Sequence, residues 1–72
     1  MNTTTHDPIS ELHDFVETQA AEDAVLTPNE RRYQADLVTD VLDQEHLKPS
    51  VRARLIHDYS DGVARHVRRV AA

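Results

Sequence analysis

The amino-acid sequence predicts an all-α fold, either a small three-helix bundle or an open array of three helices. Pro8, Pro28 and Pro49 each open a segment in which apolar residues recur every three or four positions, as on one helix face. One glycine in 72 residues leaves few tight turns, and no segment alternates apolar and polar residues as a strand does. We therefore expect helices over about residues 8–24, 28–47 and 50–70.

Length and composition predict a single folded domain over residues 8–72, preceded by a flexible tail over residues 1–7. The chain has no cysteine, no signal-peptide pattern and no apolar run near the ~18 residues that a membrane span needs. These features predict a cytoplasmic protein that binds no membrane. A composition rich in Ala, Val, Asp and Arg with one lysine is typical of a GC-rich bacterial or phage genome.

Charge divides the chain into an acidic front and a basic end. Residues 1–47 carry eleven acidic and two basic side chains, whereas residues 48–72 carry six basic and two acidic ones. The net charge of −5 therefore combines a front of −9 with an end of +4. This polarity constrains the choice of binding partner more than the overall charge does.

Helix starts and apolar stripes support each predicted helix. Asp7 is a good N-cap for the first helix, and Thr27 with Glu30 forms a capping-box sequence for the second. The inward stripe of the first helix holds Ile9, Leu12, Val16 and Ala20, with Phe15 beside it. The stripe of the second holds Tyr33, Leu37 and Val41, with Val38 and Leu42 beside them, and Asp36, Asp40 and Asp43 lie opposite.

The third helix contains the one ambiguous segment, Ser60-Asp61-Gly62, where a glycine C-cap would end a helix. The apolar phase nevertheless continues across Gly62 from Leu55 and Tyr59 to Val63 and Val70. A break would reset that phase, so we expect a continuous helix in which Gly62 lets a neighbouring helix approach closely.

No residue pattern predicts catalysis, a cofactor or a small-molecule substrate. The serines and threonines lack a nucleophile-elbow context, and there is no glycine-rich phosphate loop. His13 with Glu17 and His57 with Asp61 have the i, i+4 spacing of paired metal ligands, but surface exposure is the simpler interpretation and we expect no metal site. We therefore expect a non-enzymatic protein.

The preferred functional hypothesis is a protein–protein interaction module that docks on a larger protein or self-associates. A small core without disulfides gains stability from such docking, and opposite charge orients the partners. His66 projects onto the apolar side of the third helix, as a core or interface histidine or as a pH-sensitive contact. The candidate contact residues are Asp36, Asp40, Asp43, Tyr59, Val63, His66, Val67 and Val70.

The alternative hypothesis is a nucleic-acid-binding regulator that uses the basic helix over residues 50–70. Its candidate phosphate contacts are Arg54, Arg65, Arg68 and Arg69. Two features oppose it: the pairs Arg54–Asp58 and Asp61–Arg65 offset part of the positive charge, and the rest of the chain would repel a polyanion.

Overall fold

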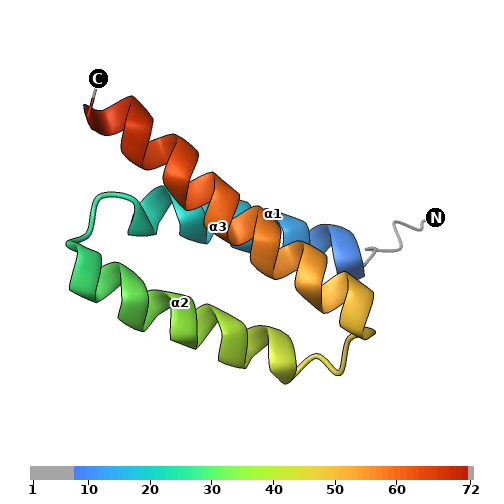
Figure 1. Cartoon of the computed structure of the whole chain (residues 1–72). Coiled ribbons are helices and arrows are strands. Elements are labelled where there is room, and N and C mark those ends of the chain that lie inside the picture. Colours follow the sequence, from blue (N-terminus) through green and yellow to red (C-terminus); the bar gives the residue numbers. More distant parts are fainter. Residues whose placement is uncertain (1–7, 72) are drawn as a thin grey trace.

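The protein is a small three-helix fold, seen in a computed structural model that describes residues 8–71 (Figure 1). Its helices are α1 (Pro8–Asp23), α2 (Pro28–Asp43) and α3 (Pro49–Ala71). The described residues contain no strand. This confirms the predicted all-α class, whereas the expected N-cap at Asp7 and the tail over residues 1–7 lie outside the described residues.

The helices are packed unequally. α1 packs along α3 over much of its length, whereas α2 makes far fewer contacts with either of them. Figure 1 shows α1 and α3 crossing closely, with α2 lying to one side of the pair. The fold is therefore a tight two-helix pair to which a third helix is attached more loosely.

α1 and α3 approach closely at Gly62. It is buried, and a Cβ added to it would lie 2.9 Å from the Cβ of Ala20. A carbon atom cannot occupy that position unless one of the two helices moves. The prediction of a continuous third helix is confirmed, because α3 passes through Ser60-Asp61-Gly62 without a break.

The hydrophobic core is smaller than the stripes of the sequence predicted. Its buried apolar side chains are Val16, Ala20, Val38, Leu42, Leu55 and Tyr59. On α2 only Val38 and Leu42 are buried, so the predicted inward line of Tyr33, Leu37 and Val41 is wrong. The apolar side chains of α2 span about half of the helix circumference, which is wider than the ~100° stripe that a surface helix usually buries.

The connection between α1 and α2 is held by local hydrogen bonds. The backbone N–H of Thr27 donates to Glu30 Oε1 at 3.0 Å, and the N–H of Glu30 donates to Thr27 Oγ1 at 3.3 Å. This confirms the predicted capping box, and the hydrogen bonds from Thr27 lower the pKa of the Glu30 carboxylate. Arg31 Nη1 also donates to the carbonyl oxygen of Leu26 at 2.8 Å, which places a cation just past the C-terminal end of α1.

The predicted end of the second helix at about residue 47 is wrong, because α2 ends at Asp43. The chain then turns through Gln44, Glu45 and His46, and His46 has a φ of 54°. A left-handed residue commonly ends a helix, but glycine or asparagine usually takes that position. The sequence therefore carried no recognisable stop signal at this point.

A buried polar pair joins α1 to α3. The Tyr59 hydroxyl donates to Asp23 Oδ2 at 2.5 Å, and Gln19 Nε2 donates to Asp23 Oδ1 at 3.0 Å. Asp23 is only 2% exposed, so these two donors replace the water that the carboxylate loses on folding. Burial, followed by the hydrogen bond to Asp23, raises the pKa of the Tyr59 hydroxyl.

Candidate protein-binding surface

The main candidate surface is a line of large apolar side chains on the outside of α2. Tyr33, Leu37 and Val41, here called the α2 strip, are 64%, 39% and 39% exposed. Their spacing of four residues places them along one side of the helix. Val38 and Leu42, which directly follow Leu37 and Val41 in the sequence, are buried. The apolar side of α2 therefore has an exposed half and a buried half that lie next to each other.

Acidic side chains lie on the side of the α2 strip that faces away from the buried Val38 and Leu42. Asp36 and Asp40 are exposed, and neither carboxylate forms an ion pair with another residue of the described segment 8–71. Asp43, the third predicted acidic contact, forms an ion pair with Arg52 and so ties the end of α2 to the start of α3. Two of the three predicted acids therefore remain available beside the strip.

The predicted contacts on α3 fall into a buried and an exposed group. Tyr59 is 4% exposed and bonded to Asp23, so it belongs to the core and not to an accessible surface. Val63, His66 and Val67 are half-buried, and Val70 is 65% exposed. The apolar face of α3 therefore continues beyond the part of the helix that the other two helices cover.

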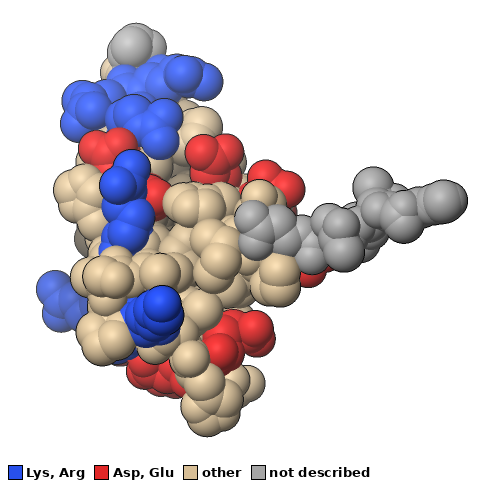
Figure 2. Space-filling model, turned by 90° about the vertical axis from the view of Figure 1, so that its right-hand side faces the viewer, with Lys and Arg blue, Asp and Glu red and all other residues tan. Residues whose placement is uncertain are grey.

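The four arginines considered for nucleic-acid binding differ in their surroundings. Arg54 Nε lies 3.2 Å from Asp58 Oδ1, and Arg65 Nε lies 3.0 Å from Asp61 Oδ2. Arg68 and Arg69 lie in the last turn of α3 and are exposed. Figure 2 shows a cluster of Lys and Arg at the top, where α3 ends, and a mixture of acidic and basic side chains below it.

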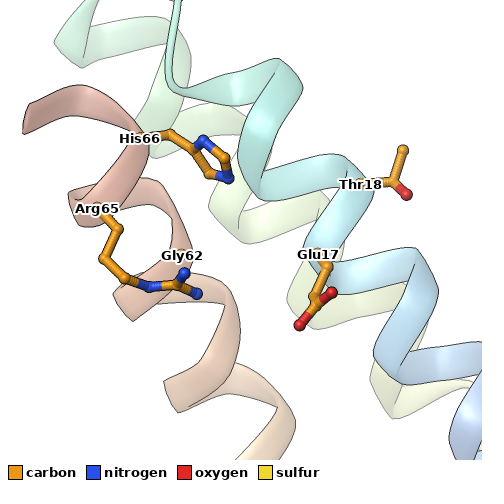
Figure 3. A pocket seen from close by; sticks show the side chains of 5 residues that line it. All are labelled: Glu17, Thr18, Gly62, Arg65 and His66. Carbon is orange, nitrogen blue, oxygen red and sulfur yellow. The ribbon is translucent and has the colours of Figure 1, made fainter. Parts of the chain in front are cut away.

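A shallow hollow of about 290 Å³ lies between α1 and α3, and Figure 3 shows the side chains around it. Glu17 and Thr18 line it from α1, and Gly62, Arg65 and His66 line it from α3. The imidazole of His66 points toward α1 in this view. Arg65 is paired with Asp61 one turn earlier on α3, so part of the positive charge beside the hollow is already offset.

The histidines considered as metal ligands do not gather with other ligands. His13 Nδ1 lies 3.5 Å from Asp58 Oδ2, across the contact between α1 and α3. Within residues 8–71, no group of three or more His, Cys, Asp or Glu side chains is placed to hold a metal ion. His13 is therefore placed to form an interhelical contact.

Sequence reasoning missed the α2 strip as a surface, because it assigned all five apolar residues of α2 to one inward face. The signal was the width of that arc, which exceeds what two neighbouring short helices cover.

No helix among the described residues is long and apolar enough to cross a membrane. Comparisons of the chain with protein-family models, with curated proteins and with solved structures found no match.

Proposed function

We propose that the chain is a small, non-enzymatic protein-binding module and that the α2 strip is its docking surface. The observation that carries this proposal is the exposure of Tyr33, Leu37 and Val41 in one continuous line. Full burial of an exposed leucine or valine side chain contributes about 1.5–3 kcal/mol, and a partner that covers the exposed part of Leu37 or Val41 gains a fraction of that. A contiguous apolar line bordered by charged residues is typical of a protein-binding surface.

The chemistry of the strip favours a helical, basic partner. Tyrosine is one of the residue types that contribute most to binding energy at interfaces. An apolar line with a spacing of four residues suits the apolar face of another helix, and Asp36 and Asp40 would attract positive charge on it. Such a module acts as an accessory subunit, a regulator or a phage-encoded factor, and its place is the cytoplasm.

Site-specific photo-crosslinking in the native host tests the proposal. A benzophenone amino acid replaces Leu37 in the strip, and in a second variant it replaces Val25, which is 69% exposed in the turn after α1. We expect one discrete protein adduct from position 37 and none from position 25, because Leu37 lies in the docking surface and Val25 lies outside it. The adduct is measured by immunoblotting and identified by mass spectrometry.

A matched pair of aspartate substitutions controls for loss of folding. Val41→Asp places a charge in the strip, whereas Val25→Asp makes the same change at an exposed site outside it. Val41→Asp should abolish the adduct from position 37, and Val25→Asp should leave it intact. Equal labelling from positions 25 and 37, or labelling that survives Val41→Asp, would contradict the proposal.

Nucleic-acid binding is the second candidate, favoured only by the exposure of Arg68 and Arg69 at the end of α3. Because Arg54 and Arg65 each pair with an aspartate, the helix presents less free positive charge than its arginine count suggests. A gel shift at low salt that disappears in R68A/R69A would support this function. Absence of any shift at low salt would rule it out.

A further inference from the structure

A second exposed apolar surface lies at the C-terminal end of α3. Residues 63–71, here called the α3 tip, carry Val63, Val67 and Val70 at spacings of four and three residues. Val63 and Val67 are half-buried, whereas Val70 is 65% exposed, and Figure 1 shows the C-terminal end of α3 extending beyond α1 and α2. The stripe therefore runs from the core at Leu55 and Tyr59, through Val63 at the edge of that core, to the exposed Val70.

The α3 tip and the α2 strip match in length and oppose in charge. From Val63 to Val70 the helix rises about 10 Å, and from Tyr33 to Val41 it rises about 12 Å. Arg68 and Arg69 make the end of α3 that carries the tip basic, whereas Asp36 and Asp40 add negative charge to the part of α2 that carries the strip. Apolar lines of similar length with opposite charges beside them are complementary surfaces.

The two surfaces do not meet within one chain. Figure 1 shows the C-terminal end of α3 at the top of the molecule and α2 along the bottom. α2 and α3 also make few contacts with one another. A tip can therefore reach a strip only on another molecule.

We infer that the α2 strip of one copy binds the α3 tip of a second copy, so that the partner of the proposed binding surface is this chain itself. The inference rests on the proposed function, because it assigns an occupant to the same strip. Because the strip and the tip are different surfaces, their contact produces either a closed ring or an open chain of copies. The smallest closed form is a two-fold dimer in which the strip of each copy binds the tip of the other. Association would bury apolar surface that a domain of this size cannot cover alone.

Charge reversal on each surface, followed by mixing, tests this pairing with purified full-length protein. D36R/D40R makes the strip basic, and R68D/R69D makes the tip acidic. In either variant alone the two surfaces repel, so self-association should weaken at least about tenfold, which corresponds to about 1.4 kcal/mol. An equimolar mixture should recover association, because each contact then joins an acidic surface to a basic one. Sedimentation equilibrium measures all three samples.

The control reverses two acids elsewhere. Asp14 and Glu22 are exposed on α1, and D14R/E22R changes the net charge by the same amount as D36R/D40R. This variant should self-associate as the wild-type chain does. Circular dichroism establishes that every variant retains its helices, so that weaker association is not mistaken for unfolding.

Three outcomes would overturn the inference. They are a wild-type chain that stays monomeric at all concentrations, undiminished association of R68D/R69D alone, and a mixture that associates no better than its components. The crosslinking experiment separates this failure from failure of the proposed function. An adduct from position 37 to a different protein would leave the α2 strip as a docking surface and remove only its assignment to a second copy.

Discussion

The α1–α3 pair and α2 illustrate two uses of an amphipathic helix in one small fold. Between α1 and α3 the apolar surfaces meet closely, at the Gly62–Ala20 approach and around the hydrogen bond from Tyr59 to Asp23. α2 instead buries Val38 and Leu42 and presents the α2 strip to solvent. Helical periodicity therefore locates an apolar face but does not determine which half of a wide face the fold covers.

The largest expected effect comes from truncating leucines on the two sides of α2. Leu42→Ala should lower the free energy of unfolding by about 2–5 kcal/mol, since Leu42 is fully buried and its loss leaves a cavity. Leu37→Ala, the same truncation on the exposed side, should change it by no more than about 0.5 kcal/mol. Urea denaturation followed by circular dichroism measures both at a protein concentration that keeps the chain monomeric. Equal destabilisation by the two substitutions would show that Leu37 belongs to the core.

A smaller effect is expected where polar groups join α1 to α3. Tyr59→Phe removes one of the two donors to the buried Asp23 carboxylate and should cost about 1–3 kcal/mol of unfolding free energy. Phe15→Leu is a comparison substitution, because it changes a half-buried aromatic residue of α1 without removing a hydrogen bond. If Tyr59→Phe were as stable as the wild-type chain, the hydrogen bond to Asp23 would contribute nothing.

The same substitution should change the alkaline pH dependence of stability. The pKa of Tyr59 is raised in the folded chain above its ordinary value of 10.0. Above about pH 10 the unfolded chain therefore loses the Tyr59 proton while the folded chain keeps it, and the stability of the wild-type chain falls as the pH rises. Tyr59→Phe should lack this component of the decline. Urea denaturation from pH 8 to pH 11 measures it, and parallel declines in the two chains would contradict the assignment.

The smallest of these effects tests the close approach of α1 and α3. Gly62→Ala gains about 1 kcal/mol of helix propensity, but its Cβ collides with Ala20 at a cost of about 1–3 kcal/mol, so a net loss is expected. Ala20→Gly alone should lose about 1 kcal/mol of helix propensity. The double variant Ala20→Gly/Gly62→Ala should be more stable than either single one, because the collision is removed. Thermal unfolding compares the wild-type chain, the two single variants and the double variant. If the stability changes of the two single variants simply add up in the double variant, the collision between the two Cβ atoms is contradicted.

Features that depend on neighbouring residues were the ones that sequence could predict. Thr27 and Glu30 cap α2 through bonds that span three residues, so their spacing alone identifies the motif. The continuity of α3 through Gly62 followed from the unbroken apolar phase on both sides of it. These features need no knowledge of how the three helices pack together.

Features that depend on distant residues could not be predicted in the same way. Asp23 lies three residues after Ala20 and so continues the stripe of α1, yet its partner Tyr59 is 36 residues away. His46 adopts a left-handed conformation in the turn after α2, where glycine or asparagine is the usual signal that a helix ends. Which side of the apolar arc of α2 is exposed was likewise decided by the placement of α1 and α3.

The central claim is that α2 is the loosely packed helix and the one that binds a partner. Hydrogen exchange of single amides, measured by NMR at low and at high protein concentration, tests it. In the dilute chain, the amides of α2 should open with lower free energies than those of α3 between Leu55 and Gly62. At high concentration, protection should rise over Tyr33–Val41 and the α3 tip and stay unchanged in the middle of α1. Equal opening free energies throughout the three helices, with no change on concentration, would contradict the account.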